Sequence, residues 1–198
     1  MSLTAIKYHR GVSRWEPNAQ GRLVQAALEL YVERGFEQTT VAEIAKLAGL
    51  TERTFFRYFG DKREVLFWGA GALQELLVSA IATAPKTEAP IATIRSAIEA
   101  AGAVFQERRE GSLLRQSVIA LNTELQEREL IKLASLAAAM AEGLRQRGVA
   151  EPGASLTAEA GIAVLKIAFE RWVKAGGELD LPRLIRDTFD DFKTATIG

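Results

Sequence analysis

The segment from residue 38 to residue 66 constrains the fold most strongly, because it holds the signals for two short helices joined by a tight turn. Thr40 can cap the first helix, with Glu43 three residues later as its capping-box partner. Apolar residues recur on one face of that helix at Val41, Ile44, Ala45 and Ala48. Gly49 then suits a left-handed helix end, and Thr51 can cap the next helix. We therefore predict a compact helix-turn-helix unit.

The second of these helices has two chemically different faces. At 100° per residue, Phe55 and Phe59 point to one side, and Arg53 and Arg57 point to the other. We expect the aromatic side to anchor the helix and the arginine side to face outward. A helix of this width fits the major groove of B-DNA, where an arginine can pair with guanine O6 and N7. This pattern predicts DNA binding.

The polar side chains of the unit suggest separate roles. We expect Arg53 and Thr54 to contact bases, and Arg57, Tyr58 and Lys62 to bind phosphate oxygens, which sets register without reading sequence. The full set of predicted DNA-binding residues is Thr40, Thr51, Arg53, Thr54, Phe56, Arg57, Tyr58 and Lys62. The alternative is a solvated helical hairpin, since exposed cations on helices are common.

The same residues resemble the helix-turn-helix signature of TetR/AcrR-type transcriptional regulators. The shared pattern over residues 40–62 is Thr-Val-x-x-Ile-Ala-x-x-Ala-Gly-Leu-Thr-x-x-Thr-Phe-Phe-x-Tyr-Phe-x-x-Lys. Residues 21–36 resemble the first helix of that family, so the resemblance covers roughly residues 15–66. One departure is Phe56, where many members carry tyrosine. Phe56 has no hydroxyl for a phosphate, and Tyr58 is expected to supply that contact instead.

The resemblance implies an all-α fold of about nine helices, with a three-helix DNA-binding domain followed by a larger helical bundle. The expected organisation is a flexible arm (1–15), the helix-turn-helix domain (16–61) and an effector-binding and dimerisation domain (62–198). It implies a repressor that binds a palindromic operator as a homodimer and is released by a small apolar or aromatic effector. The alternative is a helical DNA-binding dimer that is controlled by a protein partner or is unregulated.

Composition bears on the other classes of function. The chain has no cysteine and its only histidine is His9, which leaves no thiolate or histidine cluster for catalysis or for a transition metal. We therefore expect no enzyme, no catalytic residues, no metal and no cofactor. We find neither a run of roughly 18 uncharged apolar residues nor an apolar signal core, so we expect a cytoplasmic protein that does not contact membranes.

Charge is divided unevenly along a chain whose net charge is zero. Residues 1–63 carry ten Lys or Arg and seven Asp or Glu, which gives +3, and residues 64–198 carry −3. The cationic end is the one predicted to bind DNA. Lys7, Arg10 and Arg14 precede the first helix and are candidates for contacts with phosphates or a minor groove; the alternative is a solubilising tail.

The rest of the chain reads as helices, and no alternating pattern is long enough for a strand. The predicted spans are 62–83, 90–108, 112–120, 124–147, 156–175 and 181–194. Asp61 and Glu64 have the spacing of another capping box at the start of the first span. Gly69 and Gly71 lie inside that span at a cost of roughly 1 kcal/mol each relative to alanine, which suggests either a pivot or a closely packed neighbour.

Two groups of apolar residues in this region have candidate roles. The last two helices carry apolar stripes that we predict to form a dimer interface, namely Ile162, Leu165, Phe169, Trp172, Leu184, Ile185, Phe189 and Phe192. The alternative is that these stripes cover the core of their own subunit. The candidate lining of an effector cavity is Phe67, Trp68, Phe105, Leu114, Met140, Phe169 and Trp172, each of which suits an ordinary core equally well.

Overall fold

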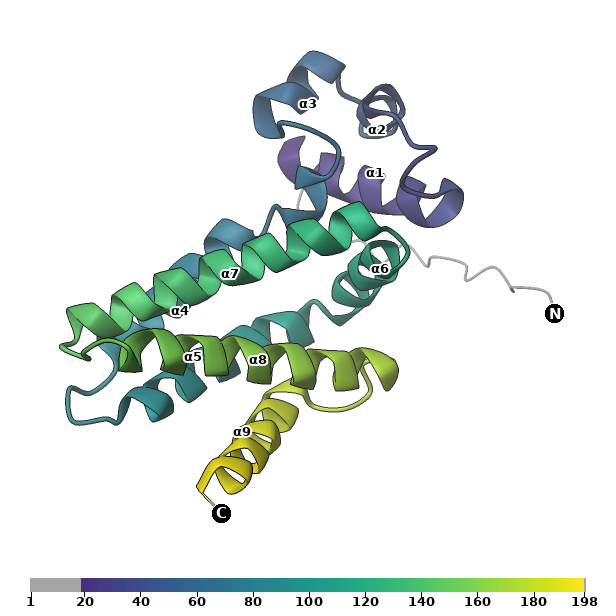
Figure 1. Cartoon of the computed structure of the whole chain (residues 1–198). Coiled ribbons are helices and arrows are strands. Elements are labelled where there is room, and N and C mark those ends of the chain that lie inside the picture. Colours follow the sequence, from purple (N-terminus) through teal and green to yellow (C-terminus); the bar gives the residue numbers. More distant parts are fainter. Residues whose placement is uncertain (1–18, 198) are drawn as a thin grey trace.

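The protein folds as helices stacked in two parts, as the computed structural model in Figure 1 shows for residues 19–197. Every regular element in this range is helical, which confirms the predicted fold class. The elements are α1 (Ala19–Arg34), α2 (Val41–Leu47), α3 (Glu52–Tyr58), the 3-10 helix η1 (Glu64–Phe67), α4 (Ala70–Thr83), α5 (Pro90–Glu107), α6 (Arg109–Ala120), α7 (Thr123–Gln146), α8 (Gly153–Lys174) and α9 (Leu181–Ile197). The predicted cationic arm, with Lys7, Arg10 and Arg14, lies outside the described residues.

Helices α1 to α3 form the small part. Thr40 and Glu43 make both bonds of the predicted capping box at α2, and the Thr51 hydroxyl accepts from the backbone N–H of Thr54 at the start of α3. Gly49 ends the turn between them with φ +65°, a conformation that glycine adopts without strain. These local signals place the two helices as the sequence predicted.

The predicted helix over 62–83 is wrong in one respect, because the chain forms η1 and then α4. Gly69 lies at the N-terminal boundary of α4 with φ −76°, so it is not inside a continuous helix. A Cβ atom at Gly69 or Gly71 would meet nothing within 4 Å, so a closely packed neighbour does not explain these glycines. The gap predicted between the spans 90–108 and 112–120 is also absent, because α6 already begins at Arg109.

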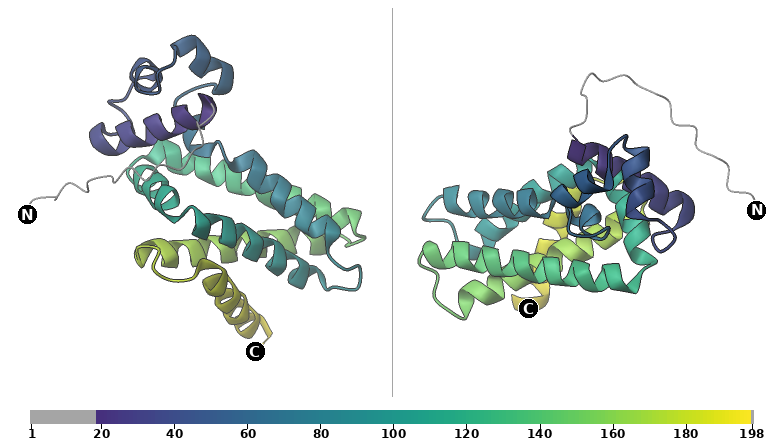
Figure 2. Two further views of the ribbon diagram at one scale, coloured as in Figure 1. Left: turned by 180° about the vertical axis from the view of Figure 1, so that it is seen from behind. Right: turned by 90° about the horizontal axis from the view of Figure 1, so that it is seen from above.

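Two clusters of buried side chains hold the molecule together. The larger lies among α4, α5, α7, α8 and α9, where Trp172 and Met140 are fully buried. The smaller is built on α1 to α3 and η1, but it also includes Val118 and Ile119 of α6 and Leu125 of α7. The helix-turn-helix part therefore shares a core with the corner between α6 and α7, beside which it lies in the views of Figure 2.

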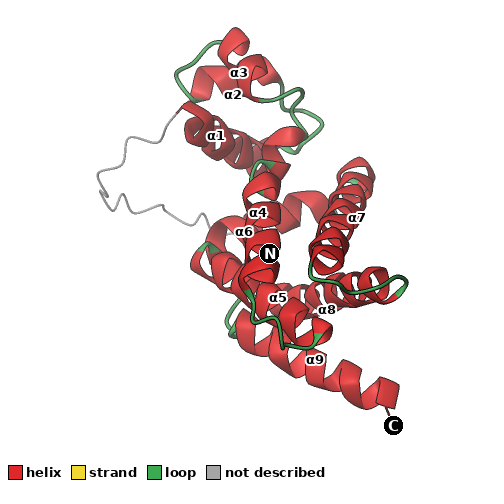
Figure 3. Cartoon of the chain, turned by 90° about the vertical axis from the view of Figure 1, so that its left-hand side faces the viewer, coloured by secondary structure: helices red, strands yellow, loops and turns green. Residues whose placement is uncertain are grey.

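The bundle places α9 at the opposite end of the molecule from α3 (Figure 3). Within the bundle, α5 and α8 approach closely at Gly161 of α8, where an added Cβ would collide with Ile94 of α5. Gly102 of α5 allows a similar approach by Ile185 of α9. Both glycines are buried, and close helix packing explains them.

One segment, Glu64–Thr83, is long and apolar enough to cross a membrane by length and composition alone, with a mean hydropathy of 1.6 and 28% of its window buried. It is interrupted between η1 and α4, and it contains the charged residues Glu64 and Glu75. Leu77 and Ile81 on its inner face are fully buried in the larger cluster. We interpret it as a helix of the folded bundle.

Candidate nucleic-acid interface

Helix α3 lies at the free end of the helix-turn-helix part, away from the bundle (Figure 1). Phe55 and Phe59 are buried against the other helices of that part, whereas Arg53 and Arg57 are exposed. This is the two-faced helix that the sequence predicted. It leaves a cationic helical surface free to enter a groove.

The start of α3 holds two hydroxyl groups in a defined arrangement. The Thr51 hydroxyl lies 3.0 Å from that of Thr54, and it accepts from the Thr54 backbone N–H at 3.2 Å. Thr51 is exposed and Thr54 half-buried. The helix cap therefore orients the two threonines that were predicted to bind DNA, although their contact with DNA stays a prediction.

The end of α3 gathers a cation and aromatic rings at the surface. Arg57 donates a hydrogen bond of 3.1 Å to the Tyr58 hydroxyl, and its guanidinium lies 4.9 Å from the centre of the Tyr58 ring. Phe56 is 55% exposed and packs edge-on against buried Phe55. A large exposed ring beside a polar group suits a contact with sugars, phosphates or thymine methyl groups.

The N-terminus of α2, the first helix of the pair, is capped by the predicted Thr40–Glu43 capping box. The Glu43 carboxylate accepts from the Thr40 backbone N–H at 2.9 Å and from its hydroxyl at 2.8 Å, and Arg34 donates to it at 3.1 Å. The hydrogen bond from the Thr40 backbone N–H lowers the pKa of Glu43, and the hydrogen bond from the Thr40 hydroxyl lowers it further. Thr40 is exposed at the start of α2 and retains its candidate role.

Lys62 differs most from its predicted role. Its ammonium donates to the backbone oxygens of Phe36 at 2.8 Å, Thr39 at 3.1 Å and Glu37 at 3.2 Å. It also lies 4.4 Å from the centre of the Phe36 ring. All three ammonium donors are thus used within the protein, and the phosphate contact predicted for Lys62 would compete with them.

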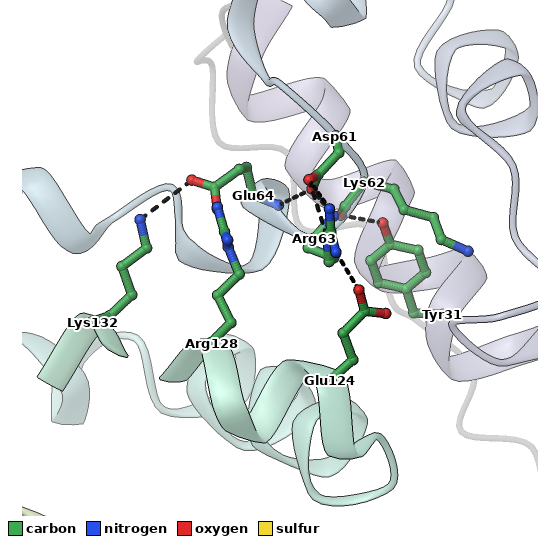
Figure 4. Close-up of polar contacts among 8 residues, drawn as sticks. All are labelled: Tyr31, Asp61, Lys62, Arg63, Glu64, Glu124, Arg128 and Lys132. Atoms are coloured by element: carbon green, nitrogen blue, oxygen red, sulfur yellow. Dashed lines mark hydrogen bonds and ion pairs between the residues drawn. The ribbon is translucent and has the colours of Figure 1, made fainter. Parts of the chain in front are cut away.

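Asp61 forms half of the predicted capping box. Its carboxylate accepts from the backbone N–H groups of Arg63 at 2.8 Å and Glu64 at 3.2 Å, and the Arg63 side-chain hydrogen bond lowers the pKa of Asp61. Glu64 does not return the bond. Its carboxylate instead pairs with Arg128 and Lys132 of α7 (Figure 4). Spacing along the chain gave no sign of these partners, which come from a distant helix.

The predicted effector residues do not form one group. Phe105, Phe169 and Trp172 lie together. The ring centre of Phe169 is 5.4 Å from that of Phe105 and 5.5 Å from that of Trp172. Met140 is fully buried in the bundle core, and Leu114 of α6 is half-buried. Phe67 belongs to the smaller core, and Trp68 is 42% exposed. The sequence missed that residues 67 and 68 sit where the two parts of the molecule meet.

A pocket of about 290 Å³ opens at that junction. Its lining combines aromatic and charged side chains with the glycines after α3 and within α4: Gln20, Tyr58, Phe59, Gly60, Glu64, Phe67, Trp68, Ala70, Gly71 and Lys132. Among the described residues, no group of His, Asp and Glu side chains has the arrangement of a metal site.

The predicted dimerisation residues are mostly core residues. Trp172 and Ile185 are fully buried within the subunit, and Ile162, Leu165, Leu184 and Phe189 are at most 7% exposed. These six have almost no surface left for a partner, so their assignment to an interface is corrected to the alternative of a core within one subunit. Phe169 is half-buried and Phe192 is 38% exposed. Amphipathic spacing cannot distinguish these two kinds of burial.

The fold and the exposed face of α3 together define a helix-turn-helix DNA-binding protein with an attached helical bundle. Residues 23–67 match the family model described as bacterial regulatory proteins, tetR family. This part of the chain matches the family that the sequence pattern indicated.

Relatives and solved structures agree with this assignment. The chain is 36% identical over 92 residues to the HTH-type transcriptional regulator TcmR of Streptomyces glaucescens, covering 46% of this chain and 39% of that protein. The match therefore spans well under half of the relative. A TetR-family structure from Syntrophomonas wolfei superposes with a TM-score of 0.67 at 19% identity, over 93% of this chain and 97% of the other.

A third comparison is with the regulator FadR of Bacillus subtilis, solved in complex with stearoyl-CoA. It has a TM-score of 0.57 and 22% identity, and covers 85% of this chain and 95% of that one. The matched relatives are regulators, in agreement with the expectation that the chain is not an enzyme.

Proposed function

We propose that the protein is a cytoplasmic transcriptional repressor that binds a palindromic operator as a homodimer and leaves it when a small apolar ligand binds the bundle. The observation that carries the proposal is the exposed cationic face of α3, held on buried Phe55 and Phe59. Such a helix presents Arg53 and Thr54 to base edges, with Arg57 and Tyr58 beside the phosphates.

Dimerisation is supported by a surface that the sequence did not single out. Helix α8 exposes apolar side chains at Leu156, Ala163 and Ile167, with half-buried Ala160 between the first two. These positions follow one helical face, and Leu156 and Ile167 are 66% and 50% exposed. An apolar stripe of this kind on a subunit suits a twofold contact with a second copy.

Ligand binding is supported by partly buried apolar side chains on five helices of the bundle. They pack against the larger core without being sealed by it, and they are Leu73 and Leu76 of α4, Phe105 of α5, Leu113 of α6, Leu133 of α7, and Phe169 and Val173 of α8. An apolar wall suits a lipophilic or aromatic ligand. The acyl-CoA complex of the B. subtilis protein makes acyl chains the first class to test.

The test begins with the full-length protein and a pool of random duplex DNA. Repeated selection should recover a palindrome, and fluorescence anisotropy should give two subunits per duplex and tight binding that scrambled DNA does not show. Selection that recovers no common sequence would count against operator binding. The recovered duplex then reports release when acyl-CoA thioesters, free fatty acids or aromatic compounds are added.

The second candidate is a DNA-binding dimer with no small-molecule ligand. It is favoured by the dense core, in which Met140 and Trp172 of the predicted cavity are fully buried. A compound panel separates the two candidates, because a ligand of the folded state raises the melting temperature, and the stabilisation grows with the logarithm of its concentration over its dissociation constant. Release of DNA by a compound that also raises the melting temperature would exclude the second candidate.

A further inference from the structure

The segment between the recognition helix and the bundle is held by side chains from α6 and α7. Residues 63–67 cover η1 and its N-terminal boundary, and three of them, Val65, Leu66 and Phe67, are buried in the smaller core. On the other side of this segment, the Tyr31 hydroxyl of α1 donates a hydrogen bond of 2.6 Å to the Lys62 carbonyl. The segment is therefore firmly attached to the helix-turn-helix part.

Arg115 of α6, a half-buried side chain, contacts the backbone of this segment. Its Nε donates to the Leu66 carbonyl oxygen at 2.7 Å, and its Nη1 donates to the Glu129 carboxylate of α7 at 2.9 Å. Its guanidinium lies 5.0 Å from the centre of the Phe67 ring. One side chain thus connects α6, α7 and the segment that carries the recognition unit.

Ion pairs extend this attachment along α7, as Figure 4 shows. Arg63 pairs with Glu124, and Glu64 pairs with both Arg128 and Lys132. The cationic side chains of these pairs are 32% to 36% exposed, compared with 27% for Arg115, and partly exposed pairs contribute little individually. Arg115 differs because it binds a backbone oxygen, which cannot turn away as a side chain can.

The consequence of this arrangement is geometric. Two recognition helices on one palindrome must be held at a separation near one turn of DNA. Within a subunit, the orientation of α3 relative to the bundle depends on the packing of α1 against α6 and on how η1 is seated on α6 and α7. A loosened seat would leave α3 intact but would let its position vary.

We propose that Arg115 is a positioning residue that fixes the orientation of α3 relative to the bundle and thereby the half-site spacing that the dimer accepts. The inference rests on the proposed function, since it requires a dimer on a two-part operator. It predicts a defect in spacing selectivity without a defect in base reading.

The experiment uses the full-length protein and its selected operator, together with versions in which one or two base pairs are added or removed between the half-sites. The measured quantity is the ratio of the dissociation constant on an altered spacing to that on the selected spacing. We expect Arg115→Met to lower this ratio by about tenfold, which is within the range of coupling changes that single residues cause. Affinity for a single half-site should stay within about twofold of wild type, because no predicted base or phosphate contact changes.

Arg147 provides the matched control. It also donates to backbone oxygens, at Ile81, Ala84 and Pro85, but these lie around the other end of α4. Arg147→Met should lower the melting temperature and leave the spacing ratio unchanged. Glu129→Gln is the second variant for Arg115, because it weakens the partner of the guanidinium with little change in shape, and it should lower the ratio in the same direction.

The outcomes separate the two levels of the proposal. A wild-type protein that binds no palindrome would overturn the proposed function and this inference with it. A wild-type protein that binds its palindrome at all spacings alike would overturn the inference alone. A selective wild-type protein whose folded Arg115→Met and Glu129→Gln variants keep the wild-type ratio would overturn the inference alone. Loss of selectivity in Arg147→Met as well would also overturn it, because the effect would then be general loosening of α4.

Discussion

The Lys62 ammonium lies 2.8 Å from the carbonyl oxygen of Phe36, so a residue four positions after the recognition helix closes the loop that follows α1. Two more carbonyl oxygens, of Glu37 and Thr39, complete the set of acceptors. The lysine joins the two ends of the helix-turn-helix part through backbone atoms. This role is structural, because all these contacts form within the protein without DNA.

We predict that Lys62→Met destabilises the protein by about 1–3 kcal/mol, because the partly buried carbonyl oxygens of Phe36 and Thr39 lose a charged donor. The free energy of unfolding from urea titration measures this. Since the ammonium is already shared among three acceptors, we expect the slope of log affinity against log salt to change by less than one phosphate contact.

Lys46→Met serves as the control for a lost surface charge, because Lys46 is an exposed lysine in α2. It should leave stability within about 0.5 kcal/mol of wild type. Unfolding of Lys62→Met at the wild-type urea midpoint, combined with a salt slope reduced by about one, would restore the phosphate role predicted from sequence.

Tyr31 gives a pH prediction. Burial, with a smaller contribution from Asp61, raises the pKa of Tyr31 well above its ordinary value near 10. The unfolded chain therefore loses the Tyr31 proton first as pH rises, and this group's contribution to stability is complete below pH 10 and declines above it. Tyr31→Phe should lower stability at neutral pH, because the bond to the Lys62 carbonyl is lost, and should reduce the further loss of stability above pH 10. An unchanged alkaline profile in Tyr31→Phe would contradict this.

The sequence predicted the recognition unit well because its signals are local. Thr40 with Glu43, Gly49 and Thr51 lie within a few residues of the atoms that they bond or of the turns that they permit. The same holds for the outward arginines of α3, which follow from helical spacing alone. Local signals of this kind can be read from the sequence without knowledge of the tertiary structure.

What the sequence could not predict depends on contacts between distant segments. Glu64 has the spacing of a capping partner for Asp61, yet two cations of α7 take its carboxylate. Leu165 and Ile185 have the spacing of an interface stripe, yet both are buried within the subunit. Amphipathic spacing shows that a face is buried and leaves open what buries it.

The glycines of the bundle provide a paired test of stability. Gly71 lies in α4 with open space around its missing Cβ, so Gly71→Ala should stabilise the protein by about 0.5–1 kcal/mol through the lower entropy of the unfolded chain. Thermal unfolding measures the change. If a pivot at α4 is needed for ligand response, release of operator DNA by the ligand should weaken in the same variant.

Gly161→Ala is the opposite case. Its Cβ would collide with Ile94, and overpacking of this kind costs about 1–3 kcal/mol. A higher melting temperature for Gly161→Ala than for Gly71→Ala would contradict the packing seen between α5 and α8.

The exposed arginines of α3 should have separable effects on DNA. Arg53→Ala should cost about 1–3 kcal/mol in operator binding and relax the preference at one base pair, as loss of a base contact does. Arg57→Ala should weaken binding to operator and scrambled DNA alike and reduce the salt slope. Anisotropy titrations against single-base operator variants distinguish the two. Equal losses on every sequence from both variants would remove the base-reading role of Arg53.

The exposed stripe on α8 gives the last prediction. Ile167 is 50% exposed in the subunit, and a carboxylate at its position would be buried next to its twofold mate in a dimer built on this face. Ile167→Glu should therefore raise the dimer dissociation constant by roughly 100-fold or more, since like charges facing each other across an interface cost several kcal/mol. Analytical ultracentrifugation measures this, and half-site affinity should be retained while palindrome affinity falls. Ile131→Glu is the control, because Ile131 is 62% exposed on α7 and outside the stripe. Dissociation by Ile131→Glu instead of Ile167→Glu would move the interface to α7, whereas a monomeric wild-type protein at micromolar concentration would leave the α8 stripe without a second copy to bind.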